Sequence, residues 1–177
     1  MADYVGTIWT IGHSDRPMEE FLAMLHSFGI EEVADVRSYP GSRHAPQYNK
    51  ENLEKVLPAE HIIYHPIAQL GGRRKVQPDS LNTRWRHPAF RGYADYMETP
   101  GFAEGIKLLK ADTSVRRVAM MCSEAVWWRC HRSMISDYLK SEGWRVMHIM
   151  GLGKEKEHPY TAAAAIVDGK LIYKAMI

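Results

Sequence analysis

The strongest candidate for chemistry is a segment that contains both cysteines of the chain, Cys122 and Cys130. Glu124 follows Cys122 by two residues, so both side chains point the same way if a strand runs through them. Cys130, His131 and Arg132 open the next expected helix, whose free N–H groups and dipole favour an anion and lower the pKa of a nearby thiol. We therefore expect a pocket in which Glu124 acts as general acid or base, Arg132 binds an anion, and Cys122 is the nucleophile or a substrate contact.

The same segment admits other interpretations. Free cysteine is among the most buried residue types, so Cys122 could be a core residue, and Glu124 and Arg132 could form a structural ion pair. A cysteine-phosphatase loop would need Arg where Trp128 stands. The Trp127-Trp128 pair is either a core anchor or a stacking platform, of which the core anchor is the better explanation. The spacing of the Cys and His residues matches no common structural zinc site, and a reducing compartment disfavours a disulfide.

A second candidate site is the run 35–44, which begins with Asp35-Val36-Arg37 and continues through a Tyr-Pro-Gly turn to Ser42 and Arg43. A strand that ends in Asp and Arg, followed by a turn with Ser and Arg, can present two guanidinium groups to a phosphate or carboxylate. Alternatively, Asp35 and Arg37 form a salt bridge, since their alternate positions place both on one face.

The third candidate is the stretch 68–91, in which six basic residues accompany a single acid. Trp85, His87 and Phe90 lie among them, a mixture that suits phosphate contacts together with base stacking. A solvated charged face is the simpler alternative. This stretch supports a second hypothesis, a non-catalytic module that binds nucleic acid or another partner.

The elements that must position these side chains alternate between strand and helix. The sequence predicts strands at 5–11, 32–37, 61–65, 116–122 and 144–149, and helices near 15–28, 49–57, 92–98, 101–110 and 130–142. An Asp-Gly pair between apolar runs predicts a hairpin over 165–173. The alternation predicts an α/β fold with a mainly parallel sheet and helices on both faces. Ligands bind such sheets at the carboxyl ends of the strands, which is where the candidate segments fall.

Length and composition indicate one domain over 1–177, with a core at about 5–150 and a tail or hairpin in 151–177. With 45% apolar and 25% charged residues, a chain of this length can bury a core without a disulfide or metal. No apolar run could span a bilayer, and the N-terminus lacks the pattern of a signal peptide, so we expect a soluble cytoplasmic protein without a membrane partner. A net charge of +2 does not by itself indicate nucleic-acid binding.

The motifs, taken in order, resemble those of the DUF488 family over about residues 7–150. They are Thr-Ile-Gly-His-Ser at 10–14, Asp-Val-Arg at 35–37 with Pro40 and Ser42-Arg43, Tyr64, Leu-Gly-Gly at 70–72, Arg-Gly-Tyr at 91–93 with Tyr96-Met97, and Cys122, Glu124 and Cys130-His131-Arg132-Ser133. One local difference is the apolar Ala-Val-Trp-Trp run at 125–128, where the family pattern leads us to expect a short polar turn.

The resemblance implies a shared α/β fold and a shared polar pocket, without naming a reaction. The catalytic residues would be Cys122, Glu124 and His131, and the substrate- or anion-binding residues would be His13, Arg37, Ser42, Arg43, Tyr93, Cys130 and Arg132. We expect a small anionic or nucleotide-like ligand, a hydrolase or transferase reaction, and no cofactor or bound metal. A Cys/His metalloprotein is kept as a third hypothesis.

Overall fold

The computed structural model describes residues 3–176 and contains a six-stranded sheet with the order β3-β2-β4-β1-β5-β6. The strands are β1 (Thr7–Gly12), β2 (Glu32–Asp35), β3 (Ile63–Pro66), β4 (Val118–Cys122), β5 (Arg145–Gly151) and β6 (Lys154–Glu157). Strands β1 to β5 pair in parallel, and β6 joins the edge antiparallel to β5. The predicted α/β class is confirmed. The additional strand β6 was not predicted, because its four residues are all charged and exposed.

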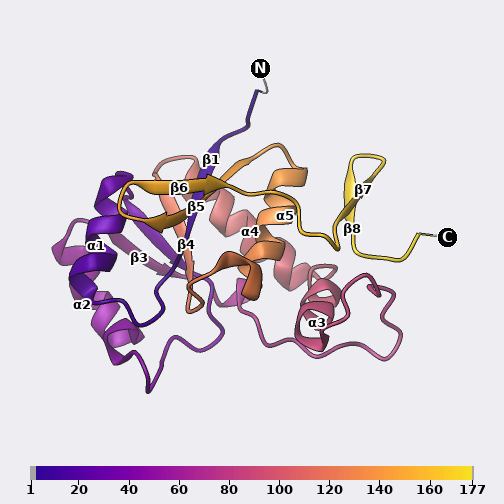
Figure 1. Ribbon diagram of the computed structural model, residues 1–177, viewed down its shortest axis with the longest axis horizontal. Coiled ribbons are helices and arrows are strands. Elements are labelled where there is room, and N and C mark those ends of the chain that lie inside the picture. Colours follow the sequence, from indigo (N-terminus) through magenta and orange to yellow (C-terminus); the bar gives the residue numbers. More distant parts are fainter. Residues whose placement is uncertain (1–2, 177) are drawn as a thin grey trace.

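Helices cover both faces of the sheet, as predicted. They are α1 (Met18–Ser27) and α2 (Lys50–Ala59) on one face, and α3 (Pro88–Tyr96), α4 (Pro100–Thr113) and α5 (Arg132–Ser141) on the other (Figure 1). Because side chains alternate along a strand, Ile8 joins the apolar cluster under α3 to α5, and its neighbour Trp9 joins the cluster under α1 and α2. No helix within residues 3–176 has the length and apolar character needed to cross a membrane.

The C-terminal segment forms the predicted hairpin from β7 (Ala165–Val167) and β8 (Lys170–Ile172). Its turn residues, Asp168 and Gly169, have φ values of 51° and 77°. Positive φ at both central positions is what a two-residue type I′ turn requires, which explains why the Asp-Gly pair is informative. Figure 1 shows this hairpin in yellow beside α5, apart from the six-stranded sheet.

The strand order determines which chain segments meet at the carboxyl edge of the sheet. Strand β4 lies between β1 and β2, with Gly12 opposite Cys122 and Asp35 opposite Met121. The segments that leave these three strands therefore start side by side. They are the segments in which the sequence places its candidate functional residues.

Candidate active site at the carboxyl ends of the strands

A pocket of about 580 Å3 opens at this edge of the sheet. Of the residues singled out from the sequence, those that line it are His13, Arg37, Ser42, Tyr93, Cys122, Glu124, Cys130 and His131. The remaining two lie elsewhere. Arg43 is exposed outside the lining, and Arg132 is buried behind it with only 1% of its surface exposed. Neither arginine lines the pocket, although both were expected to bind the anion.

The wall of the pocket continues the β1–β4 pairing beyond the strand ends. The backbone N–H of His13 donates to the carbonyl oxygen of Cys122 at 3.0 Å, and that of Ser14 donates to Ser123 at 2.9 Å. This close approach leaves no room for a side chain at Gly12, where a Cβ atom would lie 1.7 Å from the carbonyl oxygen of Glu124. Gly12 is therefore required by the packing of one backbone segment on another.

We expect Gly12→Ala to lower the free energy of unfolding by about 2 kcal/mol, because the added methyl group must displace the backbone around Glu124. Urea denaturation of both proteins measures this change. Gly41→Ala is the matched control, because Gly41 also lines the pocket but its Cβ would meet nothing closer than 3.8 Å. Equal stability of Gly12→Ala and the parent protein would contradict the steric argument.

The two cysteines meet inside the pocket. Both thiols are free, and the Sγ atom of Cys130 lies 2.6 Å from that of Cys122, to which it donates a hydrogen bond. The sulfur of Cys130 accepts in turn from the backbone N–H of Arg132 at 3.2 Å. A chain of donors thus runs from the first residue of α5 through Cys130 to Cys122.

These contacts separate the two thiols in acidity. Burial opposes ionisation of Cys122, but the hydrogen bond from Cys130 and the charge of Arg132 outweigh it and lower the pKa to about 7. Burial raises the pKa of Cys130 well above its usual value, and its bond to Cys122 raises it further. The two shifts run in opposite directions, so Cys122 is the more acidic thiol of the pair.

Arg132 supplies the positive charge behind this pair. Its Nη2 atom donates to the carbonyl oxygens of Glu124 at 3.2 Å and Ala125 at 3.3 Å. Within residues 3–176, its Nε and Nη1 atoms have no hydrogen-bond partner, and no carboxylate forms a salt bridge with it. A buried guanidinium without a counter-charge is costly, and a Cys122 thiolate would provide that charge.

A second polar array enters the pocket from β2. Arg37 donates two hydrogen bonds to Asp35, from Nε at 2.8 Å and from Nη2 at 2.7 Å, so the predicted pair forms, but buried. Tyr64 also donates to Asp35, at 2.5 Å. The remaining nitrogen of Arg37, Nη1, lies 3.2 Å from Nε2 of His13. Most of the Arg37 charge is therefore balanced within the protein, although Arg37 also lines the pocket.

The two buried histidines that line the pocket, His13 and His131, are neutral at pH 7. Burial lowers the pKa of His13 and of His131 to about 4. Nδ1 of His13 lies 2.7 Å from the carbonyl oxygen of Ser14, and Nε2 of His131 lies 2.7 Å from that of Val36. Because a carbonyl oxygen only accepts, these two ring nitrogens carry the protons. Tyr93 packs against the ring of His131, with 5.0 Å between the ring centres.

The rim of the pocket is formed by exposed residues, of which Arg129 was not expected to contact a ligand, whereas Arg73 belongs to the basic stretch predicted to contact phosphate. Glu124 is exposed there, outside the partly desolvated position expected for it. Arg73 and Arg129 are also exposed lining residues, and 52% of the Trp128 surface is exposed. The expected core role is therefore wrong for Trp128 but holds for Trp127, which is buried. The sequence did carry one indication of the exposed position of Trp128, because the run 125–128 is apolar where the family pattern suggests a polar turn.

Much of the basic stretch 68–91 is held by internal contacts. Arg84 donates to the carbonyl oxygen of Ala163 at 2.6 Å, Arg91 donates to Ser80, and Arg74 lies 3.6 Å above the ring of Tyr96. Asp95 also orders the stretch by accepting hydrogen bonds from Gln77, Ser80 and Asn82. These arginines are structural, whereas Arg73 faces the pocket and Lys75 and Arg86 are exposed.

The profile of a known family, described as "Domain of unknown function DUF488", matches residues 17–139. The chain belongs to the DUF488 family. No curated protein and no solved structure matched the chain in the same comparisons. The DUF488 match covers β2 to β4 and most of α5, and thus both arrays around Cys122 and Arg37, whereas Gly12 and His13 precede it.

The structure of this DUF488 protein also bears on metal ligands. Within residues 3–176, the group of three Cys, His, Asp or Glu ligands whose donor atoms come close enough for one ion is Glu32, His65 and Asp112. Neither cysteine belongs to such a group among these residues. The three residues of the group were not singled out from the sequence, because they lie far apart along the chain.

Proposed function

We propose that this DUF488 protein is an enzyme that binds a small anionic, nucleotide-like substrate in the strand-end pocket and attacks it with the Cys122 thiolate. The thiolate would displace a leaving group, which departs with the electron pair of the broken bond, and form a covalent Cys122 intermediate. Water or an acceptor would then break the bond to sulfur and restore the thiolate, which gives a hydrolysis or a group transfer. The observation that carries the proposal is the position of the Cys122 thiol, which lines the pocket and receives both the Cys130 hydrogen bond and the field of the buried Arg132. Both interactions favour the thiolate, which is the nucleophilic form of cysteine.

Several groups could recognise the anion and a base. Arg73 and Arg129 bring exposed guanidinium groups to the rim, and Arg37 also lines the pocket. The exposed rings of Tyr39 and Trp128 also line the pocket, so each offers a flat surface on which a base can stack. A volume of about 580 Å3 lies within the range typical of small-molecule sites.

The other polar residues suit the later steps of such a reaction. The exposed carboxylate of Glu124 could activate the water or acceptor that releases the group from sulfur. His13 and His131 are neutral and anchored to backbone carbonyls, so they act as fixed dipoles and not as cations. Arg132 would hold its position behind the thiolate, where it stabilises the charge without contacting substrate.

The test is protection of Cys122 from iodoacetamide by inorganic phosphate and by a nucleoside monophosphate, followed by mass spectrometry. We expect both anions to slow alkylation of Cys122, and the nucleotide to do so at lower concentration because its base adds stacking. Replacement of Arg73 and Arg129 by serine should weaken protection at least tenfold, since a charge-assisted contact is lost at each position. Arg86→Ser is the matched control, because Arg86 is exposed in the same basic stretch but does not line the pocket.

Two results would contradict the proposal. One is alkylation of Cys122 at a rate that no anion changes. The other is an equal loss of binding in Arg86→Ser and Arg73→Ser, measured with a single-stranded oligonucleotide at low and high salt. That pattern would favour the alternative, a nucleic-acid module whose whole basic surface contributes.

A further inference from the structure

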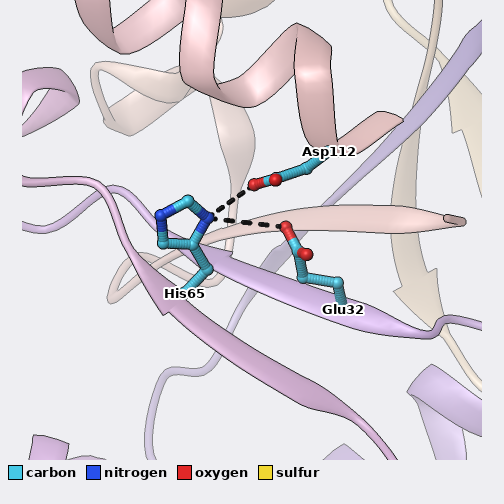
Figure 2. Close-up of side chains that lie close together, drawn as sticks. All are labelled: Glu32, His65 and Asp112. Atoms are coloured by element: carbon cyan, nitrogen blue, oxygen red, sulfur yellow. Dashed lines mark hydrogen bonds and ion pairs between the residues drawn. The ribbon is translucent and has the colours of Figure 1, made fainter. Parts of the chain in front are cut away.

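A separate cluster of ionisable side chains lies on the sheet face that α4 covers. Glu32 is the first residue of β2, His65 lies in β3, and Asp112 lies in the last turn of α4 (Figure 2). Nδ1 of His65 is 2.5 Å from Oδ2 of Asp112 and 3.9 Å from Oε2 of Glu32. One donor atom from each residue lies within 4.8 Å of the other two. Figure 2 shows both carboxylates directed at the same ring nitrogen.

Glu32 has a feature that ion pairing alone does not explain. Only 1% of its side chain is exposed, and its Oε2 atom has no hydrogen-bond partner among residues 3–176. The other oxygen, Oε1, forms an ion pair with Nη1 of Arg116 at 3.3 Å, and this ion pair does not involve Oε2. A buried carboxylate oxygen aimed at an imidazole and a second carboxylate is an acceptor that lacks its positive partner.

We propose that Glu32, His65 and Asp112 bind a divalent first-row transition-metal ion of the zinc class. One imidazole nitrogen and two carboxylate oxygens are typical ligands for such ions, whereas magnesium and calcium prefer oxygen ligands alone. Three protein ligands leave a further coordination position for water. The His65 side chain is 34% exposed, so an ion can enter from solvent without unfolding the cluster.

The ion would stabilise the fold and would not contact the pocket. Glu32 begins β2, whereas Arg37 and the pocket follow its other end. A bound ion would connect the edge strand β3, its neighbour β2 and the end of α4. This role does not depend on the proposed function, so each can fail without the other.

The experiment is calorimetric titration of the full chain with zinc chloride, in the Cys122→Ser, Cys130→Ser background so that no thiol competes. We expect one ion per chain. In Glu32→Gln and Asp112→Asn, we expect binding to weaken at least tenfold, because each change replaces a charged ligand with a neutral amide of the same shape.

His26→Gln is the matched control, because His26 forms an exposed pair with Glu60 at 3.1 Å but has no third ligand. It should bind zinc as tightly as the parent protein. Titration of the wild-type chain with cobalt serves as a second measurement if the cysteine variant fails to fold. If cobalt binds through nitrogen and oxygen atoms alone, its absorption spectrum contains no sulfur-to-metal charge-transfer band. Absence of binding, unchanged affinity in Glu32→Gln and Asp112→Asn, or equal weakening in His26→Gln would each overturn the proposal.

Discussion

Replacing Cys130 with alanine is expected to slow alkylation of Cys122 at pH 7 about tenfold. In the parent protein, the hydrogen bond from Cys130 and the charge of Arg132 lower the pKa of Cys122, so more of its thiol is ionised at this pH than in an ordinary cysteine. The variant lacks the S–H donor that stabilises the thiolate, so the pKa rises and the ionised fraction at pH 7 falls. Arg132 still lowers the pKa, which limits the change. Above pH 9, the two proteins should react at similar rates.

Thiolate absorbance near 240 nm, followed against pH, measures the ionisation without a reagent that must enter the pocket. Cys130→Ser is the conservative control, because a hydroxyl group can also donate to Cys122, so its titration should stay closer to that of the parent. Cys122→Ser identifies the signal, because the remaining Cys130 thiol has a raised pKa and should not titrate near pH 7. A midpoint that is unchanged in Cys130→Ala would show that the donor chain does not set the acidity.

Replacing Asp137 with alanine is expected to lower the free energy of unfolding by about 4 kcal/mol. Asp137 is fully buried in α5. One of its oxygens accepts from His158 at 2.8 Å and from the Thr161 backbone at 3.0 Å, and the other accepts from the Thr161 hydroxyl at 2.5 Å and from Tyr173 at 2.7 Å. Alanine leaves all these donors buried without an acceptor, and each loss adds to the cost.

The same network continues toward the pocket. His158 accepts from His148 at 2.8 Å, and His148 accepts from the hydroxyl of Thr10 at 2.5 Å. The ring of His148 stacks on Trp127, with 4.7 Å between ring centres. Trp127 is buried, and the next residue in the chain is the exposed Trp128. The network therefore joins the C-terminal segment to the loop that carries Cys130.

Urea denaturation measures the stability of Asp137→Ala, and limited proteolysis reports whether the segment 158–173 detaches. Tyr173→Phe is the graded control, since it removes one of the hydrogen bonds and should cost about 1 kcal/mol. If Asp137→Ala lost no more stability than Tyr173→Phe, the carboxylate would not be the centre of the network.

The elements of the fold were largely predictable because their signals are local. Apolar strands buried on both faces, helices with one apolar side and the Asp168-Gly169 turn each leave a pattern within a few residues. Strand β6 was the exception, because an exposed edge of alternating lysine and glutamate carries no apolar signal. The position of the candidate site followed from the same logic, since strand ends in a parallel sheet meet at one edge.

The sequence alone determined an α/β chain that places Cys122 and Arg37 near the ends of two strands, whereas the structure showed that these strands, β4 and β2, are neighbours. Only the tertiary structure decided what each side chain does there. It turned Arg132 inward, where its charge acts on Cys122, left Arg43 in solvent, and brought Arg73 and Trp128 to the rim. It also joined Glu32, His65 and Asp112, residues from two strands and a helix. These arrangements arise from packing between segments that are far apart in the sequence, and no short-range periodicity encodes that packing.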